Sequence, residues 1–139
     1  MEKKYVIGVD FGRDSVRALV IDTRTGEEIS GAVSNYRRWS EGLYCNPSES
    51  QFRQHPKDYL ESLETVLKKA VAECPDKEAI MAIGVDTTAS TPGLIDENCV
   101  PLAMREEFSE NPDAMFVLWK DHTAQQEAYH LQATVTTVS

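Results

Sequence analysis

Hydrophobic and polar positions near the N-terminus follow the pattern of three short strands. Residues 5–10 form a nearly continuous apolar run that ends in a carboxylate, which is typical of a fully buried strand. Residues 15–22 and 28–38 carry apolar side chains at alternate positions, as half-buried strands do. Turn residues at 11–14 and 23–26 separate the three segments. Because such short turns join neighbouring strands, the pattern predicts an antiparallel meander.

A helix is predicted over residues 56–74, after an irregular polar stretch at 39–54. Pro56 is tolerated in the first turn of a helix, whereas Pro75 cannot continue one. Between them, apolar side chains recur at the spacing of one helical face. They are Leu60, Leu63, Leu67, Ala70, Val71 and Cys74.

The rest of the chain alternates between strands and helices. Its pattern predicts a second buried strand at 80–86, a hairpin at 92–95 and 100–102, a short strand at 116–119 and a helix at 121–132. A helix that crosses over from a meander leads to a parallel strand, so we expect a mixed sheet. The predicted fold class is α/β, a ribonuclease H-like (actin-like ATPase) domain in which three antiparallel N-terminal strands precede alternating helices and strands.

Composition and charge narrow the function classes. With 139 residues the chain has the size of one domain, and its net charge of −9 repels nucleic acids and anionic membranes, so neither is expected as a partner. A bound polyphosphate would need local backbone N–H groups, a cationic side chain or a metal ion. No apolar run approaches a membrane span and no signal peptide precedes the first strand, so we expect a cytoplasmic protein. Three cysteines without a CxxC pair predict reduced thiols rather than disulfides or a zinc site.

Two of the predicted strands end in the same four residues, Ile-Gly-Val-Asp. The first copy ends at Asp10 and the second at Asp86. Sheets of this class bind ligands at the carboxyl ends of their strands, where a carboxylate tends to be solvated, hydrogen-bonded or metal-bound. A single Asp at such a place often only ends its strand and caps the next turn. The pair favours a functional site over that alternative.

The turn after Asp10 has features of a phosphate-binding loop. Gly12 permits a positive φ and a close backbone approach, so several N–H groups can face one anion. Ser15 adds a hydroxyl group, and Arg17 lies on the same strand face as Ser15. Asp10 is suited to Mg²⁺, directly or through water, because this ion prefers carboxylate oxygen. An Asp-x-Gly turn alone is a weak signal.

Several separate segments resemble the FGGY carbohydrate kinases. Residues 7–22 are similar to the first phosphate motif of that family. Residues 83–91 resemble the segment that lines its sugar pocket, and residues 116–124 resemble its LWxD-type signature. The resemblance extends over about residues 4–132, nearly the whole chain.

Among these kinases the chain most resembles ribulokinases. The similarity lies in Gly-Leu-Tyr-Cys at 42–45, Gln-Phe-Arg-Gln-His-Pro at 51–56 and Asp-Thr-Thr-Ala-Ser at 86–90. It implies ATP-dependent phosphorylation of L-ribulose to L-ribulose 5-phosphate, a step of arabinose catabolism. ATP and Mg²⁺ would be the cofactors, and a ketopentose and ATP the small-molecule partners.

The resemblance also assigns site residues. On the phosphate and Mg²⁺ side these are Asp10, Gly12, Arg13, Asp14, Ser15 and Arg17. On the substrate side they are Asp86, Thr88, Ala89, Trp119 and Asp121. A small Ala89, where other members have larger polar side chains, would leave room for a ketopentose. The alternatives are that Ala89 is ordinary small-residue packing and that Trp119 is a core aromatic. One departure from the family is Arg13, which stands where most members have a hydroxyl residue.

The resemblance further implies that residues 1–139 are an incomplete N-terminal FGGY domain without the C-terminal ATPase lobe. Members of the family close a cleft between two such domains, and the second supplies the adenine site and the general base. We therefore expect no catalytic base in this chain and no turnover by the chain alone. An unpaired sheet edge and the β-branched run at 135–138 favour self-association, so a homo-oligomer is expected.

Two other functions fit the same residues. The ribonuclease H fold also supports two-metal nucleases, in which Asp10 and Asp86 would bind cations together with Glu61 or Glu64. The net charge of −9 and the lack of a basic groove weigh against a nuclease. The other alternative is a non-catalytic interaction domain.

Overall fold

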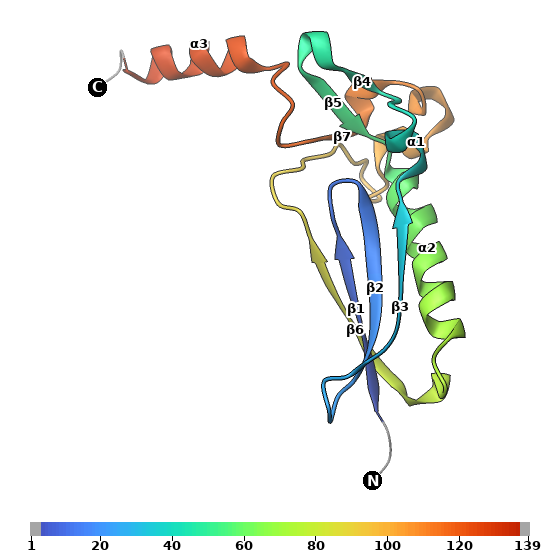
Figure 1. The fold of residues 1–139 in the computed structure, drawn as a ribbon. Coiled ribbons are helices and arrows are strands. Elements are labelled where there is room, and N and C mark those ends of the chain that lie inside the picture. The colour runs from blue at the N-terminus through green and yellow to red at the C-terminus, as the bar shows by residue number, and fades with distance from the viewer. Residues whose placement is uncertain (1–3, 137–139) are drawn as a thin grey trace.

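A mixed four-stranded sheet is the centre of the computed structural model, which describes residues 4–136. Its strands are β1 (Tyr5–Phe11), β2 (Ser15–Asp22), β3 (Glu28–Asn35) and β6 (Ile80–Thr87), in the order β3-β2-β1-β6 (Figure 1). β2 pairs antiparallel with both β1 and β3, and β6 pairs parallel with β1. The predicted meander and its parallel return strand are confirmed.

Helix α2 (Pro56–Ala72) covers one face of this sheet (Figure 1). The alternating pattern of β2 turns Val16, Ala18 and Val20 toward this face, where all three are fully buried. Val66 and Ala70 of α2 belong to the same apolar cluster. The core therefore lies between the meander and the helix.

The buried face of α2 differs in part from the predicted stripe. Ala70 is buried as predicted, but Ser62 and Val66 are buried as well, whereas Leu60 is 56% exposed. The reason is that α2 packs against β2 and β3. Leu60 instead lines a cavity between α2 and β6, where no strand of the described residues packs closely against the helix.

β1 and β6 are less buried than their apolar sequences predict. In β1, Ile7 and Val9 are buried but Gly8 is exposed, so only one face of the strand is covered. Among the described residues β6 is one of the two edge strands of this sheet, and its Ile83 and Val85 are 54% and 65% exposed. A continuous apolar run is typical of strands that are covered on both faces. Here α2 covers one face only and does not reach over β6.

A second sheet of three short strands lies beyond one end of the first (Figure 1). Its strands are β4 (Cys45–Asn46), β5 (Gln51–Gln54) and β7 (Phe116–Val117), and they are preceded or joined by the helix α1 (Arg37–Ser40) and the 3-10 turn η1 (Pro47–Glu49). The prediction of a strand to residue 38 and of a loop at 39–54 is thus partly wrong. Pairing between β5 and β7 joins segments far apart in the chain, and a local pattern does not reveal such a pairing.

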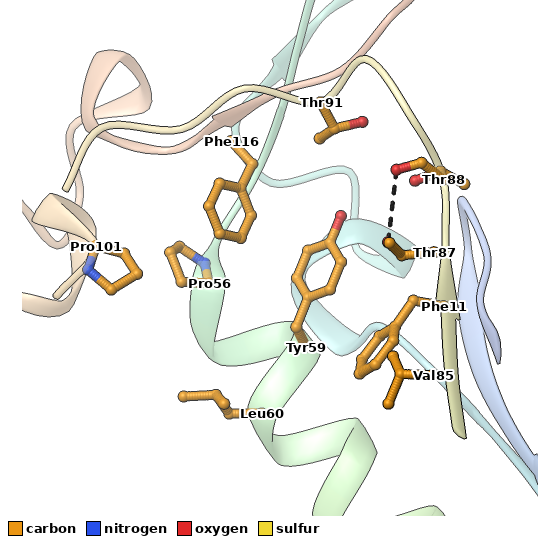
Figure 2. A pocket seen from close by; sticks show the side chains of 10 residues that line it. All are labelled: Phe11, Pro56, Tyr59, Leu60, Val85, Thr87, Thr88, Thr91, Pro101 and Phe116. Atoms are coloured by element: carbon orange, nitrogen blue, oxygen red, sulfur yellow. Dashed lines mark hydrogen bonds between the residues drawn. The ribbon is translucent and has the colours of Figure 1, made fainter. Parts of the chain in front are cut away.

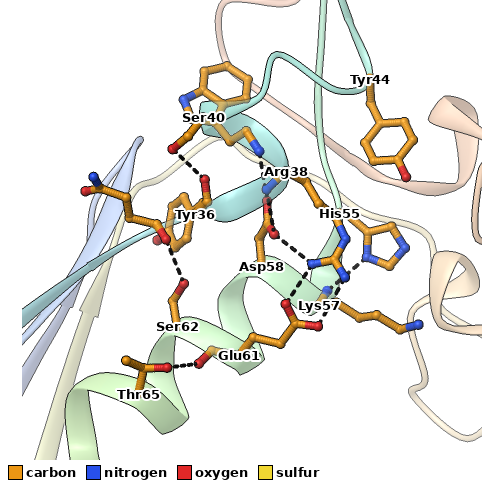
Figure 3. A network of polar contacts seen from close by, with 12 residues as sticks. Tyr36, Arg38, Ser40, Tyr44, His55, Lys57, Asp58, Glu61, Ser62 and Thr65 are labelled. Atoms are coloured by element: carbon orange, nitrogen blue, oxygen red, sulfur yellow. Dashed lines mark hydrogen bonds and ion pairs between the residues drawn. The ribbon is translucent and has the colours of Figure 1, made fainter. Parts of the chain in front are cut away.

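A buried ion pair joins α1 to the start of α2 (Figure 3). The side chain of Asp58 is 1% exposed and accepts hydrogen bonds from Arg38 Nη1 at 2.8 Å and from Trp39 N at 3.1 Å. Arg38 also binds Glu61 at 2.8 Å. A buried charge is tolerated when it is paired and hydrogen-bonded, so this network fixes α1 on α2.

Most of the chain between β6 and α3 is irregular. The 3-10 turns are η2 (Lys77–Ala79), which precedes β6, and η3 (Leu102–Met104), η4 (Glu106–Phe108) and η5 (Pro112–Ala114). The predicted hairpin is reduced to one bridge between Ile95 and Pro101. Among the residues described here, no helix is long and apolar enough to cross a membrane.

Helix α3 (Gln125–Thr136) begins later than the predicted range 121–132 and extends away from the rest of the chain (Figure 1). Its side chains are exposed through residue 134. The first two residues of the β-branched run at 135–138 belong to this helix and are not extended. The prediction for residues 137 and 138 lies outside the described residues.

Candidate functional site

The sheet face opposite α2 carries the two strand-end carboxylates side by side. This open face includes Asp10, Arg17 and Asp86, all of which are exposed. β1 and β6 run in a register that pairs Asp10 with Asp86, and β1 and β2 pair Asp10 with Arg17. Strand side chains alternate between faces, so all three project from the face that α2 leaves uncovered. Both carboxylates lie at the carboxyl ends of parallel strands, as the sequence predicts.

The open face is hollow beside these carboxylates. A shallow concavity of about 470 Å³ is lined by Gly8, Leu19 and Gly84 together with the charged residues. Gly8 and Gly84 are register partners, and a Cβ atom at either position would meet no atom within 4 Å. Their backbone forms an uncovered floor, which a ligand or a second protein layer can approach closely.

The turn that follows Asp10 closes tightly. Gly12 N donates to Ser15 O at 2.9 Å. Gly12 does not adopt the positive φ that glycine permits. Instead, a Cβ at this position would lie 3.2 Å from Ser15 O, so close backbone approach accounts for the glycine. At the tip, Arg13 Nε and Nη2 donate to the two carboxylate oxygens of Asp14 at 3.0 and 2.9 Å.

Positive charge surrounds the Asp14 carboxylate. The hydrogen bond from Arg13 lowers the pKa of Asp14, against the opposing effect of partial burial, and Trp39 Nε1 donates a further hydrogen bond at 2.7 Å. Lys120 Nζ lies 4.8 Å from the ring centroid of Trp39 and 4.2 Å from that of Phe52, and its charge also lowers the pKa of Asp14. Sequence reasoning did not identify Trp39 or Lys120 as neighbours of the turn. Their distance along the chain leaves no local signal.

A second cavity, of about 500 Å³, lies on the α2 side of β1 and β6 (Figure 2). Its walls are mainly apolar, with threonine hydroxyl groups on one side. Tyr59 separates Phe11 and Phe116, with ring centroids 5.8 and 5.3 Å away. Of the predicted substrate residues, Thr88 lines this cavity.

The other predicted substrate residues are not gathered around one cavity. Asp86 lies on the open face, and Ala89 is exposed just beyond the end of β6. Trp119 is 59% exposed. Within the described residues Trp119 is therefore not a core aromatic, and the exposed position of Ala89 gives no support to the alternative of ordinary small-residue packing there.

Asp121 forms a buried ion pair with Arg53. Its side chain is 2% exposed, and Oδ2 accepts hydrogen bonds from Arg53 Nε at 2.7 Å and from Phe52 N at 2.8 Å. Thr123 donates to the other carboxylate oxygen. Burial raises the pKa of Asp121, but these hydrogen bonds outweigh it and hold the pKa well below its usual range. The carboxylate thus fixes the segment after β7 to β5, and it lines neither of the two cavities.

The metal ligands of the nuclease alternative are not brought together. α2 covers the sheet face opposite to the one that carries Asp10 and Asp86. Glu61 binds Arg38, and Glu64 takes part in an exposed ion pair along α2. Within residues 4–136, no three His, Cys, Asp or Glu side chains are placed to hold a metal ion. Cys45, Cys74 and Cys99 are not joined by disulfide bonds within the described residues.

Sequence relatives are consistent with the kinase resemblance. The chain is 52% identical over 128 residues to a ribulokinase of Vibrio parahaemolyticus, in a match that covers 91% of this chain and 23% of the relative. It is 37% identical over 134 residues to a ribulokinase of Halalkalibacterium halodurans, covering 92% and 24%. The chain thus spans about a quarter of the length of these curated relatives. No family model matches the chain.

Solved structures show the same fold. A gluconate kinase of Lactobacillus acidophilus superposes with a TM-score of 0.71 and 14% identity, over 96% of this chain and 23% of that one. A ligand-bound xylulose kinase of the same organism gives a TM-score of 0.70 and 14% identity, over 94% and 23%. The chain is therefore similar in sequence to part of these ribulokinases, and it shares the fold of part of these two solved sugar kinases.

Proposed function

We propose that this chain supplies the phosphate and Mg²⁺ side of an ATP-dependent ribulokinase. The observation that carries the proposal is the register of β1 and β6, which sets Asp10 beside Asp86 on the open face, next to the turn at 12–15. Identity of 52% to a ribulokinase supports it. The concavity on the open face would be one wall of the catalytic cleft.

Further chain would complete that cleft. Residues 1–139 match about a quarter of the length of the relatives, and we infer that they form an incomplete N-terminal FGGY domain. The general base, the adenine site and the C-terminal ATPase lobe would come from the part of the enzyme that is not in this chain. Phosphoryl transfer needs positioning from both walls of the cleft, so the chain alone is expected to show no turnover.

The residues of the open face fit a magnesium ion. Mg²⁺ is usually bound by one or two carboxylates and completes its shell with water and substrate phosphates. Asp10 and Asp86 can provide two carboxylates from neighbouring strands. Arg17, the register partner of Asp10, adds a positive charge beside them. When bound, the ion would neutralise charge on the transferred phosphoryl group.

The turn would bind phosphate mainly through its backbone. The guanidinium of Arg13 is engaged by Asp14, so the N–H groups of the turn and the hydroxyl of Ser15 are the proposed contacts. N–H groups that converge in a turn make a concave site for anions. Backbone contacts of this kind do not depend on the side chain at position 13, so Arg13 can stand where most family members have a hydroxyl residue.

The proposal extends to the substrate and its setting. L-ribulose would be phosphorylated on its terminal hydroxyl group, with Thr88, Ala89 and Trp119 contributing from the loops after β6 and β7. The place in arabinose catabolism, the cytoplasmic location and assembly as a homo-oligomer are parts of the same proposal. They rest on the likeness to ribulokinases.

Replacement of Asp10 tests the proposal in a chimera. In the chimera this chain takes the place of the matching segment of the Vibrio parahaemolyticus ribulokinase. Asp10→Asn should lower kcat for L-ribulose about 100-fold or more, because positioning of the metal and phosphate is lost. Asp76→Asn changes an exposed Asp away from the open face and should leave kcat unchanged. A coupled ADP-release assay measures both, and a near-wild-type kcat with unchanged Mg²⁺ dependence in Asp10→Asn would remove Asp10 from the site.

A further inference from the structure

Two buried side chains hold the turn at 12–15 through its carbonyl oxygens. Tyr36 Oη donates to Gly12 O at 3.0 Å, and Gln54 Nε2 donates to Arg13 O at 2.6 Å. Tyr36 is fully buried, and Gln54 is 1% exposed. Neither belongs to the β1–β2 hairpin, since Tyr36 follows β3 and Gln54 ends β5. Separate elements of the fold therefore converge on this turn.

These two hydrogen bonds set the direction of the N–H groups at the tip of the turn. In a trans peptide, the C=O of one residue and the N–H of the next point in opposite directions across one rigid plane. No cis peptide occurs in the part of the chain that is described. The Gly12 carbonyl points toward the protein interior, where it accepts the hydrogen bond from Tyr36. The N–H of Arg13, across the same peptide plane, therefore points toward the solvent. Gln54 draws the Arg13 carbonyl inward, so the N–H of Asp14 also points outward.

The outward N–H groups are available to a ligand. Within residues 4–136, the N–H groups of Arg13 and Asp14 donate to no protein acceptor. The Asp14 carbonyl accepts from Tyr36 N at 3.0 Å, which holds the C-terminal side of the turn in the same way. The turn is thus anchored by carbonyl groups on its inner side and presents unpaired donors on its outer side.

The amide of Gln54 is itself fixed at both ends. A carbonyl oxygen can only accept, so the amide nitrogen must face Arg13 O, and the amide oxygen then accepts from Tyr59 Oη. Burial raises the pKa of Tyr59 to about 12 and raises that of Tyr36 as well. Both phenols therefore keep the proton that they donate at neutral pH.

Tyr59 extends this chain of contacts to the second cavity. Its ring stacks on Tyr36 with centroids 4.9 Å apart and forms part of the cavity wall (Figure 2). Gln54 thereby connects a residue of the cavity wall with the tip of the turn.

We propose that Gln54 and Tyr36 are positioning residues that aim the N–H groups of Asp14 and Arg13 at a phosphate group. Gln54 aims the first and Tyr36 the second, each through the preceding carbonyl. Tyr59 orients Gln54 from the cavity side. The identity of the anion as a phosphate of MgATP rests on the proposed function, whereas the positioning of the turn does not.

Nitrogen-15 relaxation of the 139-residue chain tests the positioning directly. Gln54→Met removes the donor to Arg13 O and should lower the order parameter of the Asp14 amide from about 0.85 to below about 0.6. Tyr36→Phe keeps the ring but removes the hydroxyl, and it should loosen the Arg13 amide first. The matched controls are Gln51→Met on the same strand and Tyr44→Phe, whose hydroxyl binds Glu110 instead. Neither control should change the turn.

The pairing of variant and amide separates positioning from general damage. A loss of stability would loosen amides throughout the chain, whereas the inference predicts a change confined to the turn and different in the two variants. Unchanged order parameters of both amides in both variants would overturn the inference. Equal loosening of amides throughout the chain in Tyr36→Phe, which removes only a hydroxyl group, would also overturn it.

Kinetics of the chimera then separate this inference from the proposed function. Gln54→Met should raise KM for MgATP about tenfold, the equivalent of one lost hydrogen bond to a charged group, with little change in KM for L-ribulose. Loosening of the turn without any change in KM for MgATP would support the positioning and contradict the phosphate site. A rigid turn in Gln54→Met would contradict the positioning whatever the kinetics.

Discussion

At the scale of single residues, the ion pair of Arg53 and Asp121 is a sensitive point of the structure. Both side chains are almost fully buried, and a buried charge that loses its partner is strongly destabilising. Asp121→Asn should lower the free energy of unfolding by about 3–5 kcal/mol in urea titrations. Asp113 touches the same guanidinium, but its side chain is 79% exposed, so Asp113→Asn should cost less than about 1 kcal/mol. Equal effects of the two changes would show that burial does not set the strength of these contacts.

At the scale of elements, the start of α2 depends on a neutral histidine. His55 Nδ1 accepts a hydrogen bond from Lys57 N and so caps the helix. Burial lowers the pKa of His55 below its ordinary value of 6.5, and the charges of Arg38 and Lys57 lower it further, against the effect of Asp58. Protonation would remove the acceptor and place a charge in a buried position. The stability that the start of α2 contributes is therefore expected to depend on pH.

The sign of that response follows from proton uptake. Between 6.5 and the lower pKa of the folded state, the unfolded chain binds a proton at this histidine and the folded chain does not. The stability contributed by neutral His55 is thus present above 6.5 and is lost as the pH falls through this window. His55→Asn, which keeps a capping side chain, should reduce the fall in Tm between about pH 7.5 and 5.5. His130→Asn on the exposed helix α3 should retain the full fall, and a similar reduction in both variants would exclude His55 as the cause.

At the scale of the whole molecule, the uncovered edge at β6 predicts self-association of the chain. β6 has no partner on its outer side among the described residues, and Met81, Ile83 and Val85 are more than half exposed. Unpaired edges and exposed apolar side chains recruit neighbours, so we expect a two-fold dimer that pairs β6 with its copy. Ile83→Lys should shift the chain toward monomer, whereas Leu131→Lys on α3 should not. A monomer mass for the unmodified chain over a wide concentration range, by light scattering at moderate salt, would rule the dimer out.

The sequence by itself determined the elements whose signal is local. The apolar run of β1, the period of two in β2 and β3 and the helical spacing of residues 56–74 are local patterns, and each of these predicted elements formed. The repeated Ile-Gly-Val-Asp ends likewise predicted two carboxylates at strand ends, because the place of a residue at the end of a strand is a property of that strand. The resemblance to sugar kinases added the expected fold, because that resemblance also lies in short contiguous motifs.

Only the tertiary structure decided which faces are covered and which polar groups meet. The sequence pattern predicts that Leu60 and β6 are buried, but their exposure depends on how far α2 extends across the sheet. Asp121 resembles a substrate residue, yet Arg53, 68 residues earlier, takes up its carboxylate. The anchors of the turn, Tyr36 and Gln54, lie 24 and 41 residues from the carbonyl groups that they hold. Such contacts leave no periodic trace in the sequence, because they are set by the distance between elements after packing.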